Sequence, residues 1–170
     1  MNFNRVAVIG ISGSGKSTFA SVLAARTGLP LLHGDQLEWQ ADWTLRPEPD
    51  LHALHARWME QPRWIIEGWM DPARTERLTV ADIVIDLDPP TLLCAWRVLA
   101  RMVRGERRSE MPAGCVDRFS WRMLSTVLLR KERPYIDDAL KAATLKEYAR
   151  LRTRREVADW LTSAAECWRE

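Results

Sequence analysis

Residues 10–17 read Gly-Ile-Ser-Gly-Ser-Gly-Lys-Ser, which matches the phosphate-binding pattern G-x-x-x-x-G-K-[ST]. We call residues 10–17 the glycine loop. The apolar run 6–9 precedes the loop, as a buried strand would, and residues 18–24 follow it with helical character. Strand, loop and helix in this order aim backbone N–H groups and a helix N-terminus at anionic oxygens. The sequence therefore predicts a nucleoside triphosphate site; the alternative is a glycine-rich turn that matches by chance.

The motif gives its residues expected roles. Lys16 would act in catalysis by reaching the β- and γ-phosphates, and the Ser17 hydroxyl would bind Mg²⁺. The expected cofactors are therefore ATP and Mg²⁺. The expected nucleotide-binding residues are Gly10, Ser12, Gly13, Ser14, Gly15, Lys16, Ser17 and Thr18.

Composition narrows the class of protein. The 170 residues are 46% hydrophobic and 28% charged, and the formal net charge is +2. This charge is too small to imply nucleic-acid binding by itself. No apolar stretch approaches the roughly 20 residues needed to cross a bilayer, and the N-terminus runs directly into the first strand without room for a signal peptide. The three cysteines contain no C-x-x-C pair, which argues against a disulfide framework and a zinc site. We expect one cytoplasmic domain over 1–170, as a monomer or homodimer.

Strand and helix patterns alternate along the chain, which is typical of a parallel sheet with helices on both faces. Ligand is expected over the C-terminal ends of the strands. The predicted strands are 5–9, 30–33, 64–67, 82–87 and, more weakly, 145–151. The predicted helices are 16–27, 49–59, 90–103, 121–131, 134–143 and a last one that a capping box opens at Thr153.

Several segments resemble the adenylate-kinase-like P-loop kinases, and most closely the topology modulation (FlaR-like) proteins. They are the glycine loop, 33–39, Trp43, 64–68, 77–78, 81–82, 87–90, Arg97, Arg101, 114–115 and 152–156. The resemblance spans nearly the whole chain. It implies a P-loop NTPase fold, α/β with a five-stranded parallel sheet, and a short helical lid.

The resemblance also implies that a segment over about 35–63 binds the phosphate acceptor. Asp35 follows the second strand, where an aspartate in related small-molecule kinases orients or deprotonates the acceptor hydroxyl; an N-cap on the next helix is the other interpretation. Trp39 is a candidate substrate contact that could stack on a base or sugar, and it could equally pack beneath the segment. Arg77 matches the FlaR-like pattern and is expected to bind substrate. Nucleoside monophosphate kinases usually follow the Asp-Gly of the third strand with an aromatic residue and then Pro-Arg. Here Gly68 is followed by Trp69, Met70 and Asp71, and the missing Pro-Arg puts a nucleotide acceptor in doubt.

Glu67 ends the third strand, where relatives usually carry Asp-Gly and the carboxylate holds Mg²⁺ through water. We therefore expect Glu67 and Ser17 to hold the metal. Asp86 and Asp88, at the end of the fourth strand, are the competing carboxylates.

Arginines gather beyond residue 96. Arg97, Arg101, Arg104 and Arg108 have spacings of one helix face. Like charges on one face repel, so triphosphate oxygens are expected to compensate them; a solvated basic face is the alternative. We expect a lid over about 104–118, with Arg101, Arg104 and Arg108 acting in catalysis.

These features together favour an ATP- and Mg²⁺-dependent kinase with a small-molecule acceptor: a nucleotide, a nucleoside or a hydroxylated metabolite. The alternative is an ATP-hydrolysing regulatory switch related to DNA topology modulation.

Overall fold

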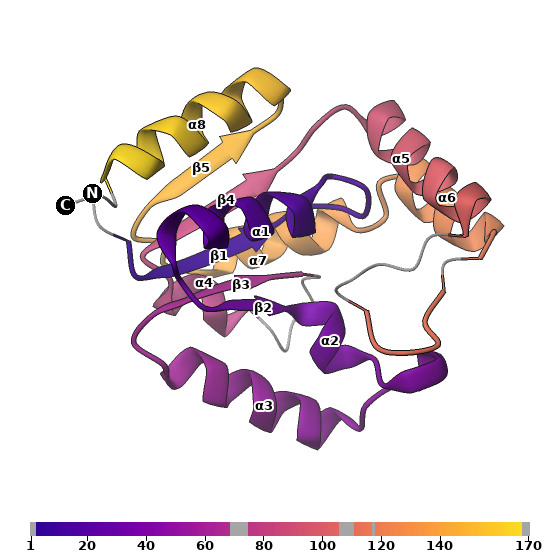
Figure 1. Ribbon diagram of the computed structural model, residues 1–170, viewed down its shortest axis with the longest axis horizontal. Helices are drawn as coiled ribbons and strands as arrows, with labels where there is room; N and C mark the ends of the chain where they lie inside the picture. The colour runs from indigo at the N-terminus through magenta and orange to yellow at the C-terminus, as the bar shows by residue number, and fades with distance from the viewer. Residues whose placement is uncertain (1–2, 69–74, 106–110, 117, 168–170) are drawn as a thin grey trace.

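The computed structural model describes residues 3–68, 75–105, 111–116 and 118–167 (Figure 1). Within the predicted lid at about 104–118, residues 106–110, which include Arg108, lie outside the described residues, and so does residue 117. None of the described helices is long and apolar enough to cross a membrane.

Five strands form one parallel sheet in the order β2-β3-β1-β4-β5. They are β1 (Arg5–Ile9), β2 (Leu31–His33), β3 (Trp64–Glu67), β4 (Ile83–Leu87) and β5 (Tyr148–Leu151). Every residue of β3 and β4 is buried, and so is all of β1 after Arg5, as expected for strands covered on both faces. The predicted five-stranded parallel sheet is confirmed. The weak fifth strand is an edge strand, where the exposed Tyr148 and Arg150 are tolerated.

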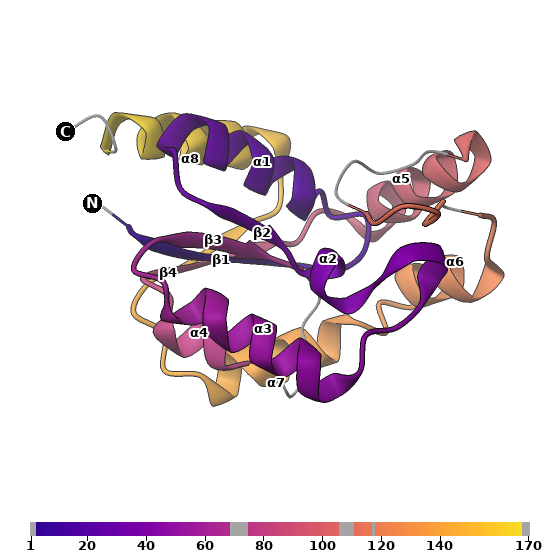
Figure 2. The same cartoon turned by 60° about the horizontal axis from the view of Figure 1, so that its bottom comes forward.

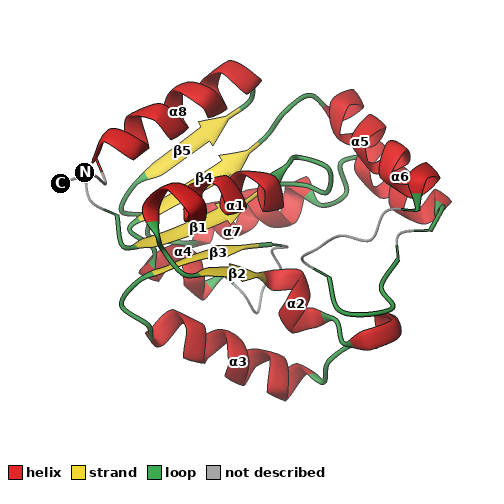
Figure 3. Cartoon of the chain, in the orientation of Figure 1, coloured by secondary structure: helices red, strands yellow, loops and turns green. Residues whose placement is uncertain are grey.

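Helices cover both faces of this sheet. They are α1 (Lys16–Thr27), α2 (Gly34–Glu38), α3 (Glu48–Glu60), α4 (Glu76–Val80), α5 (Thr91–Arg104), α6 (Trp121–Leu128), α7 (Arg133–Ala142) and α8 (Arg154–Cys167), with a 3-10 turn at Ala41–Trp43 (Figure 3). Figure 2 shows α1 and α8 on one face and α3, α4 and α7 on the other, with α5 and α6 beyond the end of the sheet.

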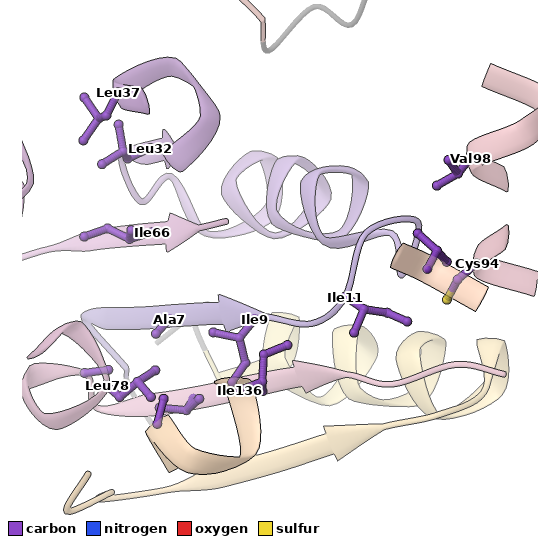
Figure 4. Close-up of a cluster of buried hydrophobic side chains, with 14 of the residues drawn as sticks. Ala7, Ile9, Ile11, Leu32, Leu37, Ile66, Leu78, Cys94, Val98 and Ile136 are labelled. Carbon is purple, nitrogen blue, oxygen red and sulfur yellow. The ribbon is translucent and has the colours of Figure 1, made fainter. Parts of the chain in front are cut away.

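Each face of the sheet has its own hydrophobic core. On one face, Val8 and Ile65 of the sheet pack with Phe19 of α1 and Leu161 of α8. On the other face, strand residues pack against α4 and α7, and the cluster reaches α5; it includes Ile9, Ile66, Leu78, Cys94, Val98 and Ile136 (Figure 4). Burying each such aliphatic side chain contributes about 1.5–3 kcal/mol. The second core therefore fixes α5 against the end of the sheet where the glycine loop lies.

The helices differ from the sequence predictions in a few places. Helices α2 and α4 and the 3-10 turn form in segments for which no helix range was predicted. The helix that begins at Trp121 stops at Leu128. Helix α5 ends at Arg104 because Gly105 adopts φ 60°, a left-handed cap. Of the arginines predicted to share one helix face, Arg97, Arg101 and Arg104 belong to α5, and Arg108 lies outside the described residues.

Two strand ends come unusually close beside the glycine loop. A Cβ on Gly34 would lie 2.9 Å from the Glu67 carbonyl oxygen, and Gly68 has φ 140°. Only glycine allows this approach without a shift of the backbone. As a result, the residues that follow β2 and those that end β3 share one edge of the sheet.

Candidate functional site

The glycine loop connects β1 to α1 and packs against the first turn of α5. Gly13 has φ 79°, and a Cβ there would lie 2.4 Å from the Cys94 carbonyl oxygen. Gly15, with φ 100°, is the N-cap of α1 and supplies no side-chain cap, and the first turn of α1 has no acidic residue. The helix therefore begins with N–H groups that no capping side chain serves, and its positive end faces the loop. This arrangement fits a bound phosphate group.

Two cations contact the carbonyl oxygens of the loop. Lys16 Nζ donates to the Ile11 oxygen over 3.2 Å. Arg97 Nη1 lies 3.2 Å from the Gly13 oxygen and 3.0 Å from the Ser14 oxygen, and donates to both. Arg97, which also lines the cavity described below, therefore supports the loop through its carbonyl oxygens, a role that its helical spacing did not reveal. Lys16 has one such contact, so its ammonium group can turn to a phosphate at small cost.

A carboxylate missed by the sequence analysis also holds the loop. Glu132 Oε2 accepts from the Ser12 backbone N–H over 2.5 Å, and Glu132 Oε1 accepts from Ser12 Oγ over 2.7 Å. The Ser12 donors thus already have a protein partner, whereas nucleotide binding was expected of them. No local pattern links two residues 120 positions apart, and no sequence signal could have found this pair.

The loop opens onto a cavity of about 1130 Å³. Most of the predicted site residues line it: Ser12, Gly13, Gly15, Lys16, Ser17, Thr18, Asp35, Trp39, Glu67, Arg101 and Arg104. Gly10 and Ser14 lie outside the lining; a Cβ on Gly10 would lie 2.8 Å from Ser14 Oγ, which places the serine side chain behind the loop. The cavity brings together predicted residues from four separate regions of the chain: 12–18, 35–39, Glu67 and 101–104.

The cavity walls differ in charge. Among the described residues, Arg101, Arg104, Arg118, Arg122 and Lys131 line the wall from α5 to the start of α7, and Asp35, Glu38 and Glu67 line the wall from α2 and β3. The basic wall and Lys16 together suit a polyphosphate chain. The basic residues of this wall are spread from Arg101 to Lys131 in the sequence. They meet in space because α5 and α6 pack side by side (Figure 1).

Asp35 and Glu67, on the acidic wall, belong to different elements: Asp35 lies in a helix, and Glu67 ends a strand. Helix α2 begins at Gly34 with His33 as its N-cap, so Asp35 lies one residue inside the helix and is not its N-cap. Glu67 is buried, and its Oε1 lies 2.7 Å from His33 Nδ1. Ser17 and Glu67 both line the cavity, and hydroxyl and carboxylate oxygens are the ligands that Mg²⁺ prefers. The donor set fits the ion.

The competing carboxylates belong to a separate ion network. Arg133 Nη2 lies 2.8 Å from Asp86 Oδ2, and Tyr148 donates to the same oxygen over 2.9 Å. Arg130 and Arg150 pair with Asp88. Burial opposes ionisation of Asp88, but these two arginines outweigh it and lower the pKa of its carboxyl group. Neither carboxylate lines the cavity, so Asp86 and Asp88 join the end of β4 to α7 and β5.

Arg77 lies away from the cavity. Its side chain is 1% exposed, and Nη2 donates to the Gly68 carbonyl oxygen over 2.9 Å. This position supports the turn after β3, and it gives no support to the predicted contact between Arg77 and substrate.

Residues 111–116, which we call the strap, bridge the cavity rim to the 3-10 turn. The Asp42 N–H donates to the Ala113 oxygen over 3.1 Å, and Trp43 Nε1 donates to the Val116 oxygen over 3.3 Å. The Cys115 thiol accepts from the Trp43 N–H and donates to the Gln40 oxygen. The strap therefore joins the predicted lid to the predicted acceptor segment.

No family model matches the sequence, and no curated protein matches it. Solved structures do resemble the fold. Shikimate kinase from Acinetobacter baumannii, in complex with shikimate, has a TM-score of 0.63 and 15% identity, over 98% of this chain and 93% of that one. A gluconokinase from Sinorhizobium meliloti has a TM-score of 0.56 and 19% identity, over 96% and 94%.

A sugar kinase from a Janibacter species has a TM-score of 0.53 and 21% identity, over 98% of this chain and 94% of that one. Such identities establish the fold alone. The closer resemblance to the topology modulation proteins stays a prediction. The chain has the α/β fold of these small-molecule kinases, and it covers nearly their whole length.

Proposed function

We propose that this protein is an ATP- and Mg²⁺-dependent kinase that phosphorylates a hydroxyl group of a small molecule. The observation that carries the proposal is one cavity lined both by Lys16 with the first residues of α1 and by Asp35 of α2. Phosphoryl transfer needs this pairing: positive groups around the phosphates and a carboxylate for the acceptor.

In this proposal the residues of the loop bind the triphosphate. N–H groups at the start of α1 and the Lys16 ammonium neutralise the β- and γ-phosphate oxygens. Ser17 and Glu67 would hold Mg²⁺, which would offset charge that develops on the phosphates. Arg101 and Arg104 approach from α5 and stabilise the transferring group.

The acceptor occupies the wall formed by α2 and the 3-10 turn. Asp35 orients the acceptor hydroxyl and takes its proton as the acceptor oxygen bonds to the γ-phosphorus and the bond from that phosphorus to the β–γ bridging oxygen breaks, releasing ADP. Trp39 and Trp43 both line this part of the cavity, with ring centroids 5.2 Å apart in an edge-to-face arrangement. Their indole rings offer an apolar surface to the carbon skeleton of the acceptor.

A screen for ADP formation tests the proposal, with ATP, Mg²⁺ and a panel of nucleosides, nucleotides and hydroxylated metabolites. At least one acceptor should raise ADP formation and appear as a phosphorylated product by mass spectrometry. Lys16→Ala should abolish this activity at an unchanged melting temperature, whereas the exposed Lys141→Ala should keep it. Hydrolysis that no acceptor stimulates, but that duplex DNA increases, would favour the regulatory switch instead.

A further inference from the structure

Two opposite charges hold the peptide unit between Ile11 and Ser12. Its carbonyl oxygen accepts from Lys16 Nζ over 3.2 Å and from the Ser14 N–H over 3.1 Å. Its N–H, on Ser12, donates to Glu132 Oε2 over 2.5 Å, and the Ser12 hydroxyl donates to the other oxygen of the same carboxylate. Both the carbonyl and the N–H of this peptide, which lies near the start of the loop, are therefore held by side chains.

Charged residues on both sides of Glu132 in the chain are anchored to other elements. Glu132 is 7% exposed and lies at the N-cap of α7. On one side, Arg130 donates to Asp88 and to the Thr91 hydroxyl. On the other side, Arg133 donates to Asp86. Residues 130–133 thus connect the end of β4 and the start of α5 to the glycine loop.

A carboxylate beside a phosphate site has two opposite effects on nucleotide binding. Its negative charge repels phosphate, which weakens binding. Its two hydrogen bonds also keep the loop in one conformation, so binding does not have to order it, which strengthens binding. Because both oxygens of Glu132 already accept hydrogen bonds from the loop, part of its charge is compensated there, and the second effect should dominate.

We propose that Glu132 is a positioning residue that presets the glycine loop for phosphate and acts through Ser12. This inference rests on the proposed function, because it concerns how the same loop binds ATP. In this role Glu132 does not contact the reacting atoms. It affects the affinity for the nucleotide, and the residues of α2 and the 3-10 turn recognise the acceptor.

Calorimetry on three variants tests the role, with MgATP and inorganic tripolyphosphate as ligands. Glu132→Gln keeps the shape but loses the charge, and its side chain cannot accept from both Ser12 donors in the same way. It should raise the Kd of both ligands about tenfold, the effect of one lost charge-assisted hydrogen bond. Ser12→Ala keeps the N–H and loses only the hydroxyl, so its Kd should rise about threefold. Glu60→Gln, at an exposed position on α3, is the matched control and should behave like wild type.

The proposed role of Glu132 also predicts different effects on the KM for ATP and on the KM for the acceptor. Glu132→Gln should raise the KM for ATP and leave the KM for the acceptor unchanged, and Ser12→Ala should add little to Glu132→Gln in the double variant, because the two residues act as one unit. A residue with a purely structural role would lower the melting temperature without this selective change.

Several results would overturn the inference. An unchanged or lower Kd in folded Glu132→Gln would show that loop positioning is absent or that repulsion dominates. If Glu132→Gln does not fold, an unchanged Kd in Ser12→Ala has the same meaning. Wild-type protein that binds neither MgATP nor tripolyphosphate would end the proposed function together with this inference, whereas wild-type binding with unaffected variants would end the inference alone.

Discussion

Substitution of Gly13 by alanine tests how tightly the glycine loop packs against α5. The residue has φ 79°, and left-handed backbone costs an L-residue about 1–2 kcal/mol. The new Cβ would also lie 2.4 Å from the Cys94 carbonyl oxygen, where ordinary contact begins at 3.4 Å. Because the obstacle is backbone, the loop or α5 must shift, and such overpacking costs about 1–3 kcal/mol. We expect Gly13→Ala to lower the free energy of unfolding by about 2–5 kcal/mol, the sum of both effects.

Gly28→Ala is the matched control for this experiment. Gly28 has φ 65°, but a Cβ there would meet no atom within 4 Å. It should cost only the backbone contribution, about 1–2 kcal/mol. Urea unfolding measures both variants, and each kcal/mol corresponds to about 2–4 °C in the melting temperature of a chain of this size. ATP binding should weaken in Gly13→Ala and stay unchanged in Gly28→Ala.

The comparison can fail in two ways. Equal losses of stability in the two variants would show that the loop does not pack against the first turn of α5. Wild-type ATP affinity in Gly13→Ala, with its stability reduced as expected, would separate the packing of the loop from the binding of nucleotide and contradict the reasoning that joins them.

Three further predictions concern single side chains. Asp35→Asn should leave the Kd for ATP unchanged and slow phosphoryl transfer about 10²-fold or more, the scale of a lost general base; a matching loss of ATP affinity would instead place Asp35 in the metal site. Arg133→Met removes the closer of the two cations beside the buried Asp86, leaving Arg150 Nε at 3.7 Å, and should destabilise the protein by about 3–5 kcal/mol in urea unfolding, against about 0–1 kcal/mol for Lys141→Met in an exposed pair; similar losses would contradict the network. Burial and the charge of Asp86 raise the pKa of Tyr148 to about 12, above about 10 in the unfolded chain, so its stabilisation is complete below pH 10 and disappears as pH rises to 12. Tyr148→Phe should remove this part of the pH dependence of unfolding, and an unchanged profile would refute it.

Local sequence was enough to predict the sheet. The runs 6–9, 64–67 and 83–87 are short and apolar, and all lie where a strand is covered on both faces. The glycine loop could likewise be placed, since its motif, preceding strand and following helix are contiguous. Helix α2 has five residues, which is too short for a helical period to appear in sequence.

The remaining site residues depend on tertiary packing that sequence does not contain. Glu132 reaches Ser12 only because α7 starts beside the loop, and Arg97 reaches the loop carbonyls only because Cys94 and Val98 fix α5 in the core. Arg77 shows a limit of the sequence: a charged residue in a matching pattern suggested a substrate contact, whereas in the structure its Nη2 donates to a buried backbone carbonyl. The spacing of the arginines placed Arg97, Arg101 and Arg104 on one helix, which ends at Arg104 because Gly105 caps it.

The strap has a consequence for the order of events in a catalytic cycle. Its hydrogen bonds to the 3-10 turn join two parts of the cavity lining that lie far apart in the sequence, because Trp43 and Val116 both line the cavity and Trp43 Nε1 donates to the Val116 oxygen. The strap and the turn should therefore move as one unit. Asp42 and Trp43, each held at positive φ, store conformational strain that separation of the two segments would release. In the proposed kinase, this separation would be a conformational step of the cycle distinct from phosphoryl transfer.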